Sequence, residues 1–266
     1  MSIHPTAIID SGAELDSSVS VAPYAVIEKG VRIDSDTEIG PHSLISGKTT
    51  IGKGNIIGPF TAIGAPPQDI KYNGEDTELR IGDKNTIREY TSIHRGTTDG
   101  HGVTTIGDSN FFMSYSHVAH DCTLGNHIIL VNSASLGGHV TVGDRVTVSG
   151  LSAIHPFCTI GEYAYVGAMS GATMDIPPYV IVTGLRGDMV VRSINRIGLK
   201  RAGYSGEEIR KLIRAFTIIF KTEDLLLHDA LKKVEEEMPD SALVANLVNF
   251  FKTSTRYVVR AGSNGD

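Results

Sequence analysis

The chain has 266 residues, of which 41% are hydrophobic and 20% charged, and its formal net charge is −6. This composition indicates a globular protein, and no apolar run approaches the ~20 residues that a membrane helix needs, so we expect no stable membrane insertion. The first residues lack a basic segment followed by an apolar stretch, which predicts no signal peptide and a cytoplasmic location.

Charge is distributed unevenly along the sequence. Residues 1–183 carry 10 basic and 19 acidic side chains, a net −9, whereas residues 184–266 carry 14 and 11, a net +3. The C-terminal part is therefore the better candidate for binding an anionic partner, although this excess is too small to indicate nucleic acid.

An apolar residue recurs at every sixth position from the start of the chain. The first run is Ile3, Ile9, Leu15, Val21, Ile27, Ile33, Ile39, Ile45, Ile51, Ile57 and Ile63. A single helix or an alternating strand does not have this period, and a fixed period over so many cycles is typical of a repeat architecture. Hexads predict a mainly β protein: a parallel β-helix with 18-residue triangular coils stacked ~4.8 Å apart.

Two segments interrupt the repeat, at about 64–80 and about 94–105. After the first, the apolar positions return in the same phase at Ile81, whereas after the second the phase is shifted by one residue. We expect both segments to be loops that project from the stack. Loops inserted in a repeat without loss of the repeat often belong to its functional face.

The second run of hexads extends from Ile106 to Val166, and the repeat ends near Ala172. The run is Ile106, Phe112, Val118, Leu124, Leu130, Leu136, Val142, Val148, Ile154, Ile160 and Val166. Cys122 and Cys158 are 36 positions apart, hence two coils apart. That is ~9–10 Å, too far for a disulfide, so we expect free, buried or half-buried thiols.

From about Gly187 the pattern becomes helical. Ser205 followed by Glu208 predicts a capping box that opens a helix ending at Phe220. Further helices are expected at about 224–238 and 241–253, with a frayed tail at 261–266. The sequence thus predicts a β-helix domain at 1–186 and a small helical domain at 187–266.

Four histidines, His117, His120, His139 and His155, lie beside the second apolar run. Because residues 18 apart stack on each other, Gly138 is expected to lie against His120 with His139 beside it, and Asp121 next to His139. His155 follows one coil later. A single histidine at such a position is more often a solvated surface residue, and a single glycine more often a corner residue, but here several groups converge on one strip.

Seven segments together resemble one family. They are Gln68-Asp-Ile-Lys-Tyr-Asn-Gly-Glu75, Ile87-Arg-Glu89 with Ile93-His-Arg-Gly-Thr97, His117-Val-Ala-His-Asp-Cys122, Gly137-Gly-His139 with Ile154-His-Pro-Phe-Cys158, and Gly198-Leu-Lys-Arg201. In this order they resemble the UDP-N-acetylglucosamine acyltransferases, and the resemblance covers essentially the whole chain. Hexads alone are less specific, because many acyltransferases contain them.

The resemblance implies a left-handed parallel β-helix, an exception to the usual right-handed crossover. It also implies a homotrimer with active sites in the clefts between subunits. The implied reaction moves an (R)-3-hydroxyacyl group from acyl carrier protein to the 3-position of UDP-N-acetylglucosamine, the first step of lipid A synthesis. No cofactor and no metal are implied.

The same resemblance assigns catalytic roles. His120 would be the general base, because removing a proton from a sugar hydroxyl needs a group that titrates near neutral pH. Asp121 would orient or stabilise it. The N–H of Gly138 would stabilise the tetrahedral oxyanion, and its missing side chain would let the thioester approach.

Binding roles follow from the resemblance in the same way. Sugar, phosphate or pantetheine contacts are implied for His117, His139 and His155, and sugar-nucleotide contacts from a loop for Gln68 and Asp69. Asn195 and Arg201 would reach the nucleotide from a neighbouring subunit, and Arg suits phosphate because its fork donates two hydrogen bonds. Ala168 and Met169 would limit acyl-chain length. Docking of the acidic carrier protein would involve Lys200, Arg192 and Arg196.

The chain departs from the family pattern at three positions. Pro156 stands where a glutamine is common, Ile197 where an acidic residue is common, and Ala202 where a second arginine is usual. These changes bear on substrate details more than on the reaction class.

Four alternatives stay open at this point. A 3-amino UDP-sugar acceptor would give an amide. A coenzyme A-dependent hexapeptide acetyltransferase fits the repeat but not the loops and the helical tail. A zinc enzyme of the carbonic anhydrase type needs three converging histidines, and the usual spacing is absent. A non-catalytic β-helix would leave His120→Ala without effect on any transferase activity.

Overall fold

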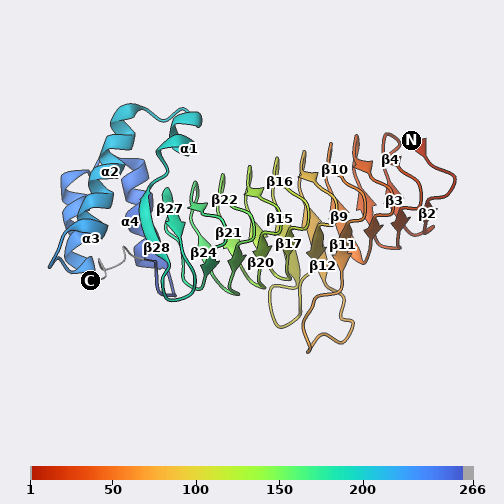
Figure 1. The fold of residues 1–266 in the computed structure, drawn as a ribbon. Coiled ribbons are helices and arrows are strands. Elements are labelled where there is room, and N and C mark those ends of the chain that lie inside the picture. Colours follow the sequence, from red (N-terminus) through yellow and green to blue (C-terminus); the bar gives the residue numbers. More distant parts are fainter. Residues whose placement is uncertain (1, 260–266) are drawn as a thin grey trace.

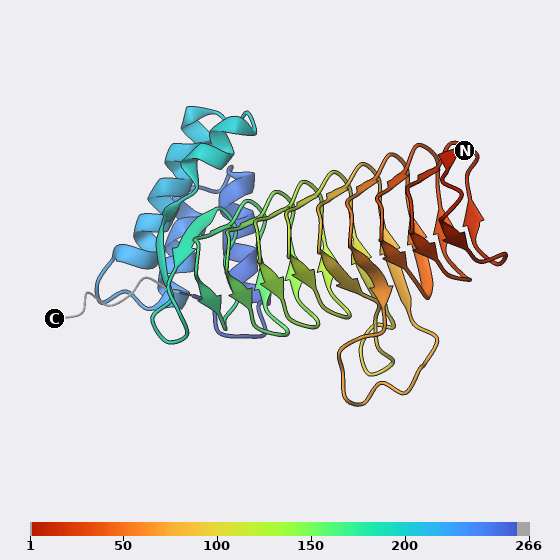
Figure 2. The same ribbon diagram turned by 45° about the vertical axis from the view of Figure 1, so that its right-hand side comes forward.

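The structure, a computed structural model, describes residues 2–259, and the predicted tail at 261–266 lies outside that range. The chain forms an elongated three-sided prism of stacked coils with a cluster of helices at its C-terminal end (Figures 1 and 2). Three parallel sheets make the sides of the prism. Among the described helices, none is long and apolar enough to cross a membrane.

Sheet A is the longest side. Its strands in spatial order are β1 (Ser2–Ile3), β4 (Ser20–Val21), β7 (Glu38–Ile39), β10 (Ile56–Ile57), β13 (Thr86–Ile87), β16 (Phe111–Phe112), β19 (Ile129–Leu130), β22 (Thr147–Val148), β25 (Tyr165–Val166), β27 (Val180–Thr183) and β28 (Val190–Ile194).

Sheets B and C form the other two sides. Sheet B contains β2 (Ile8–Ile9), β5 (Val26–Ile27), β8 (Leu44–Ile45), β11 (Ala62–Ala65), β14 (Ser92–His94), β17 (His117–Val118), β20 (Ser135–Leu136), β23 (Ala153–Ile154) and β26 (Gly171–Ala172). Sheet C contains β3 (Glu14–Leu15), β6 (Arg32–Ile33), β9 (Lys48–Ile51), β12 (Glu78–Ile81), β15 (Val103–Ile106), β18 (Thr123–Leu124), β21 (Thr141–Val142) and β24 (Thr159–Ile160).

The strand register explains the phase of the hexads. Coils are normally 18 residues apart, as in the pair His117 and Ser135. Lys48 pairs with Glu78, an offset of 30, so the first loop adds 12 residues, or two whole hexads. Glu78 pairs with Val103, an offset of 25, so the second loop adds seven residues, one hexad plus one. The first loop therefore keeps the phase and the second shifts it by one.

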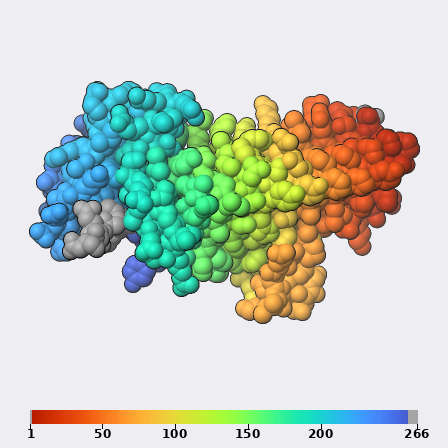
Figure 3. Space-filling view, in the orientation of Figure 1, coloured from red at the N-terminus to blue at the C-terminus, as the bar shows by residue number. Residues whose placement is uncertain are grey.

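Both predicted loops are present, but they are shorter than predicted. Strand β11 continues to Ala65 and β12 begins at Glu78, while β14 ends at His94 and β15 begins at Val103. The segments 66–77 and 95–102 project together from one side of the prism (Figure 1), and the first makes the orange lobe in Figure 3. The predicted bounds were too wide because the strands that flank the loops are longer than the usual two residues.

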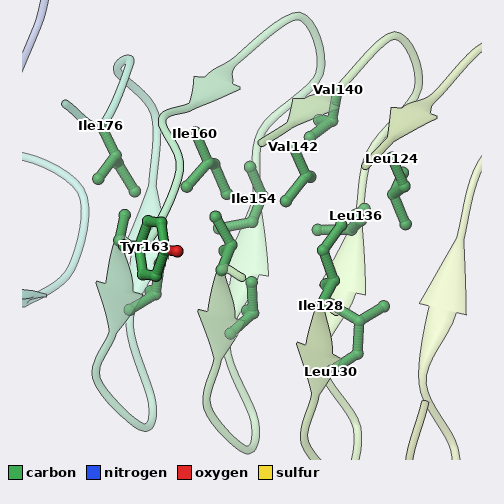
Figure 4. Close-up of a cluster of buried hydrophobic side chains, with 14 of the residues drawn as sticks. Leu124, Ile128, Leu130, Leu136, Val140, Val142, Ile154, Ile160, Tyr163 and Ile176 are labelled. Carbon is green, nitrogen blue, oxygen red and sulfur yellow. The ribbon is translucent and has the colours of Figure 1, made fainter. Parts of the chain in front are cut away.

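The apolar residue of each hexad points into the prism. Figure 4 shows Leu124, Leu130, Leu136, Val142 and Ile160 packed inside successive coils. From Val21 to Val166 every residue of the two runs is buried. Ile3 is 39% exposed, and Ile9 and Leu15 are only partly buried, because no further coil covers the N-terminal end. The stack of coils is thus the hydrophobic core.

From Tyr24 to Met169, the short turns between sheets each have one residue with a left-handed backbone, and these residues line up as three edges. The A/B edge, where sheet A passes to sheet B, consists of Tyr24, His42, Phe60, Tyr90, Tyr115, Ser133, Leu151 and Met169. The B/C edge includes Asp121, His139 and Phe157. The C/A edge includes Ser109, His127, Arg145 and Tyr163.

The C-terminal part differs from the sequence prediction at its start. The helical pattern was predicted from about Gly187, but β28 pairs antiparallel with β27 and extends sheet A. A hairpin was missed because two short apolar segments around a Gly-containing loop resemble helix periodicity. The helix α1 (Arg196–Arg201) follows, with Asn195 as its N-cap, and was not predicted. The domain boundary at 186/187 stays a prediction.

The remaining helices were predicted nearly correctly. They are α2 (Gly206–Lys221), α3 (Leu227–Glu237) and α4 (Ala242–Thr253). The capping box of Ser205 and Glu208 is confirmed, and Ser241 caps α4. Helix α4 is tied to the last coils, since Asn246 donates to Glu162 at 2.8 Å and to the hydroxyl of Tyr179 at 2.7 Å.

Candidate active site

The centre of the candidate site is a histidine–carboxylate pair on the B/C edge. His120 Nδ1 lies 2.8 Å from Asp121 Oδ2, and the Asp121 side chain is fully buried while that of His120 is 14% exposed. Burial is the largest single influence on the pKa of Asp121, and it raises that pKa. The hydrogen bonds from Thr97 and His120 together have a greater effect in the opposite direction, so the pKa lies below its usual value. An ionised Asp121 accepts from Nδ1–H, which leaves the Nε2 of His120 free to accept a proton.

Gly138 lies directly against the His120 ring, as the 18-residue register predicts. A Cβ at Gly138 would lie 2.6 Å from Cε1 and 2.7 Å from Nε2 of His120. The backbone of the neighbouring His139 donates to the carbonyl of His120 at 3.0 Å, which fixes the two coils relative to each other. Within residues 2–259 the N–H of Gly138 has no hydrogen-bond acceptor, so this donor is available near Nε2.

His139 completes this group. Its Nε2 is 4.0 Å from Asp121 Oδ2, its ring is edge-on to that of His120, and it stacks on Phe157 with centroids 4.3 Å apart. Burial lowers the pKa of His139, while the charges of Asp121 and Asp69 act in the opposite direction. Asp69, on the first loop, is thus close to the His139 side of the site.

A second histidine pair joins His117, in the same coil as His120, to His94 in the preceding coil. His117 Nδ1 is 2.8 Å from the hydroxyl of Ser92, and its ring meets that of His94 edge-on with centroids 4.9 Å apart. Burial lowers the pKa of His117, with a further contribution from His120. Burial also lowers the pKa of His94 to about 4, so both rings are neutral near pH 7.

The two loops are held against this edge and against each other. Arg95 donates to the carbonyl of Gly64 at 2.7 Å and to the hydroxyl of Tyr72 at 2.8 Å. Lys71 and Asp99 form an exposed ion pair at 3.3 Å. Gln68 and His155 are exposed, and among the described residues neither side chain is hydrogen-bonded to His120 or Asp121.

Two predicted groups lie on other edges of the same chain. Asn195 and Arg201 line a cavity of about 490 Å³ on sheet A beside the C/A edge, together with His127, Arg145 and Tyr163. Asn195 also donates to the carbonyl of Tyr163 at 2.8 Å and accepts from the N–H of Gly198 at 3.0 Å, so part of its polar capacity serves the fold. Ala168 and Met169 are exposed at the A/B edge.

Several residues at these sites were missed by the sequence reasoning. Thr97 and His101 contact Asp121 from the second loop, and His94 packs on His117. The segment Ile93–Thr97 was part of the family resemblance, but no role was assigned within it. In the cavity on sheet A, Arg145 was missed, although it is an edge residue one coil after His127.

The atoms of His120, Asp121 and His139 are also the only described group that could hold a metal ion, with ligand atoms within 4.8 Å of one another in residues 2–259. However, both oxygens of Asp121 already accept hydrogen bonds from Thr97, His101 and His120. The arrangement therefore suits an acid–base pair better than a metal centre. The predicted absence of a metal stays a prediction.

Buried thiols complete the inner side of this edge. Cys122 and Cys158 are free and buried, as predicted. Burial raises the pKa of Cys122 to about 12 and that of Cys158 to about 11, so neither is a nucleophile near neutral pH.

Comparisons with known proteins identify the family. Residues 175–259 match the family model described as Udp N-acetylglucosamine O-acyltransferase; Domain 2. The acyl-[acyl-carrier-protein]–UDP-N-acetylglucosamine O-acyltransferase of Anaeromyxobacter sp. (strain K) is 48% identical over 98% of this chain and 100% of its own. The protein of the same name from Halorhodospira halophila is 48% identical over 97% of this chain and 99% of its own.

Solved structures with a similar fold belong to the same family. LpxA from Acinetobacter baumannii superimposes with a TM-score of 0.92 at 39% identity, covering 97% of this chain and 99% of that one. The UDP-N-acetylglucosamine acyltransferase of Francisella novicida gives 0.94 at 34% identity, covering 98% and 95%. The predicted left-handed β-helix with a small helical C-terminal part is confirmed. The chain belongs to the UDP-N-acetylglucosamine O-acyltransferase family.

Proposed function

We propose that the protein transfers an (R)-3-hydroxyacyl group from acyl carrier protein to the 3-hydroxyl of UDP-N-acetylglucosamine, as the first step of lipid A synthesis. The observation that carries the proposal is the His120–Asp121 pair at 2.8 Å with Gly138 against the ring. The names of relatives at 48% identity over nearly the full chain support the two substrates. The cytoplasmic location stays a prediction.

In the proposed mechanism His120 Nε2 removes the proton of the sugar 3-hydroxyl as its oxygen attacks the thioester carbonyl. Asp121 stabilises the imidazolium that forms. The C–O bond forms first, and the N–H of Gly138 stabilises the resulting oxyanion. The C–S bond then breaks, and the thiolate of the carrier takes the proton from His120.

We also propose that the active protein is a homotrimer, because the predicted site residues lie on different edges of one chain. The A/B edge exposes stacked rings along its length, with Tyr24 56%, Phe60 47%, Tyr90 46% and Tyr115 59% exposed. Neighbouring rings in the series Tyr24, His42, Phe60, Tyr90, Tyr115 are 4.8–5.3 Å apart. An exposed apolar strip of this length indicates an interface.

Three copies that turn their A/B edges toward a common axis would place sheet B of one copy against sheet A of the next. The outer end of that interface is the B/C edge of the first copy, with His120, facing the C/A edge of the second, with Arg201 and its cavity. The inner end is the A/B edge, with Ala168 and Met169. This arrangement supports nucleotide contacts by the partner's Asn195 and Arg201 and an acyl chain that runs inward along the interface.

Docking of an acidic carrier protein would use exposed basic residues near α1, namely Arg192, Arg196 and Lys200. Arg196 and Lys200 are chain neighbours of Ile197 and Arg201, which line the cavity on sheet A, so a carrier docked there would deliver its thioester to the same cleft. The contacts with the substrates by Gln68, Asp69, His117, His139 and His155 belong to the proposal in the same way.

The test is a transfer assay with UDP-N-acetylglucosamine and a series of 3-hydroxyacyl carrier proteins. The wild-type protein should transfer one of them, and His120→Ala should lose ~10²-fold or more. His228→Ala, an exposed histidine on α3, is the matched control and should keep full activity. Transfer only to the 3-amino sugar would change the acceptor, and activity with acetyl coenzyme A alone would refute the carrier-protein requirement.

A further inference from the structure

The second loop, residues 95–102, closes over the carboxylate of Asp121. The N–H of Thr97 donates to both carboxylate oxygens at 3.1 and 3.0 Å, and the Thr97 hydroxyl donates to Oδ2 at 2.6 Å. The N–H of His101 donates to Oδ1 at 2.9 Å. The loop thus supplies three of the four groups that hydrogen-bond the carboxylate, and His120 supplies the fourth.

The loop also shields the carboxylate from water. A Cβ at Gly100 would lie 2.4–2.6 Å from the carboxyl atoms of Asp121, so the loop backbone packs directly on this group. The loop is braced internally, because the N–H groups of Gly100 and Gly102 donate to the carbonyl of Thr97 at 3.2 and 2.9 Å. The N–H of Gly96 donates to the carbonyl of Glu78 at 3.0 Å, which joins the loop to β12.

A buried carboxylate normally needs a cation or several donors to remain ionised. Within residues 2–259 no lysine or arginine pairs with Asp121. The titratable groups that face it are His120 and His139, with the thiol of Cys122 adjacent in the chain, while Asp69 and the ring of His101 act on His139. Uncharged donors from the loop therefore replace a counter-ion, and Thr97 provides most of them.

We propose that Thr97 is a positioning residue that keeps Asp121 ionised and oriented toward the Nδ1 of His120, so that Nε2 stays free to act as base. This inference rests on the proposed transferase function. It gives the seven-residue insertion of the second loop a role: the insertion brings a hydroxyl and two backbone N–H groups onto a carboxylate that the coil alone would leave without them.

Removal of the hydroxyl changes the pH dependence in a defined direction. Thr97→Val keeps the shape of the side chain and both backbone donors, but it removes the 2.6 Å bond to Oδ2. The carboxylate is then less stabilised, so the pKa of Asp121 rises. A more basic carboxylate makes the coupled His120–Asp121 pair bind a proton at higher pH, so the acid limb of kcat/KM, which reports this pair, should move to higher pH.

The experiment compares the pH profiles of wild type, Thr97→Val, Thr97→Ser and the matched control Thr98→Val, at an exposed neighbouring threonine of the same loop whose hydroxyl makes no hydrogen bond among the described residues. For Thr97→Val we expect the acid limb to move up by about one pH unit and kcat at neutral pH to fall about tenfold, with KM for the sugar nucleotide within about twofold. Thr97→Ser restores the profile because it restores the hydroxyl. Thr98→Val leaves it unchanged.

A second measurement separates this inference from the proposed function. The carboxyl carbon of Asp121, followed by NMR in ¹³C-aspartate-labelled protein, should titrate at higher pH in Thr97→Val than in wild type, whether or not the substrate is the proposed one. Equal losses in Thr97→Val and Thr97→Ser, or an Asp121 titration that does not move, would overturn the inference. Absence of transfer in wild type with a shifted titration would instead refute the proposed function alone.

Discussion

Two edges of the same prism use one backbone geometry for different purposes. The B/C and A/B edges both consist of turns with left-handed residues at φ near +60°, for example Asp121 at 58° and Leu151 at 58°. On the A/B edge these positions carry exposed aromatic and aliphatic side chains, whereas on the B/C edge they carry a buried carboxylate and a histidine. The repeat therefore determines the position of each edge residue. The type of side chain there determines whether the edge suits acid–base chemistry, as at the B/C edge, or contact with another chain, as proposed for the A/B edge.

Both edges have the same left-handed turn residues, but the surroundings of these residues differ between the two edges. At the B/C edge the second loop covers Asp121 and excludes water, which strengthens every hydrogen bond to it. At the A/B edge no described loop covers the rings, and the outer faces of Tyr90 and Tyr115 stay exposed. Substitutions at equivalent positions of the two edges should thus have unequal effects.

The largest effect is expected for Gly138→Ala, compared with Gly150→Ala. Both glycines immediately precede an edge residue, and neither has a positive φ, so the backbone of each accepts alanine. At Gly138 the new Cβ would lie 2.6 Å from the His120 ring, whereas at Gly150 the nearest atom is 3.3 Å away. A His120 ring that turns aside loses its bond to Asp121, and we expect ~10²-fold or greater loss of kcat/KM.

Gly150→Ala is expected to keep activity within about threefold, because the neighbouring carbonyl of Asn132 needs to move by only a few tenths of an ångström. Circular dichroism should show that both variants are folded. A Gly138→Ala protein with nearly full activity would contradict the placement of thioester and base on this strip.

The next effect concerns the A/B edge. Phe60→Asp puts a charge in the middle of the ring stack, and a charge buried at a threefold axis without a partner is strongly unfavourable. We expect the proposed trimers to dissociate in sedimentation experiments and activity to fall by about tenfold or more, because the proposed site needs two chains. Thr141→Asp, on the exposed face of sheet C, introduces the same charge away from the axis and should stay trimeric.

Subunit mixing sharpens this comparison. Trimers of His120→Ala and trimers of Arg201→Ala should each be impaired, but mixed trimers contain interfaces in which an intact His120 faces an intact Arg201. Activity should therefore return after subunit exchange. If mixing restores nothing while exchange is complete, His120 and Arg201 act within one chain, and the threefold arrangement is wrong.

The repeat could be predicted from the sequence, whereas the contacts made by the loops could not. The period of six placed Leu124 and Val142 inside the prism and Gly138 on His120, because the strand register is fixed by buried side chains. The same arithmetic could not place Thr97 on Asp121. The course of an inserted loop depends on its own hydrogen bonds, such as Arg95 with Tyr72, rather than on the period.

The hexad pattern also could not predict the β27–β28 hairpin or the position of Asn195 and Arg201 relative to His120. The hairpin β27–β28 leaves the repeat, so its apolar residues no longer report a period of six. Asn195 and Arg201 were expected at the nucleotide, but in one chain they lie at a different edge from His120. Symmetry between copies is not encoded in any local pattern, so the composite site remained an implication of the family resemblance.

The smallest expected effect is visible only in acid and concerns His94. Burial lowers its pKa to about 4, whereas an unfolded histidine titrates near 6.5. As pH falls below 6.5 the unfolded state binds a proton that the folded state does not, so stability falls between pH 6.5 and about 4 and is fully retained above 6.5. The loss attributable to His94 should reach ~2 kcal/mol at pH 5.

His94→Leu removes this titration. It breaks no hydrogen bond of Nδ1, because this atom is buried and has no hydrogen-bond partner among the described residues. Urea unfolding at pH 7.5 and pH 5, at one protein concentration, should show a smaller loss of stability in the variant than in wild type by that amount. His228→Ala, whose ring is 90% exposed, should leave the pH dependence as it is. Parallel losses in wild type and His94→Leu would mean that His94 is protonated in the folded protein, and that the buried histidine pair beside His120 carries a charge near pH 5.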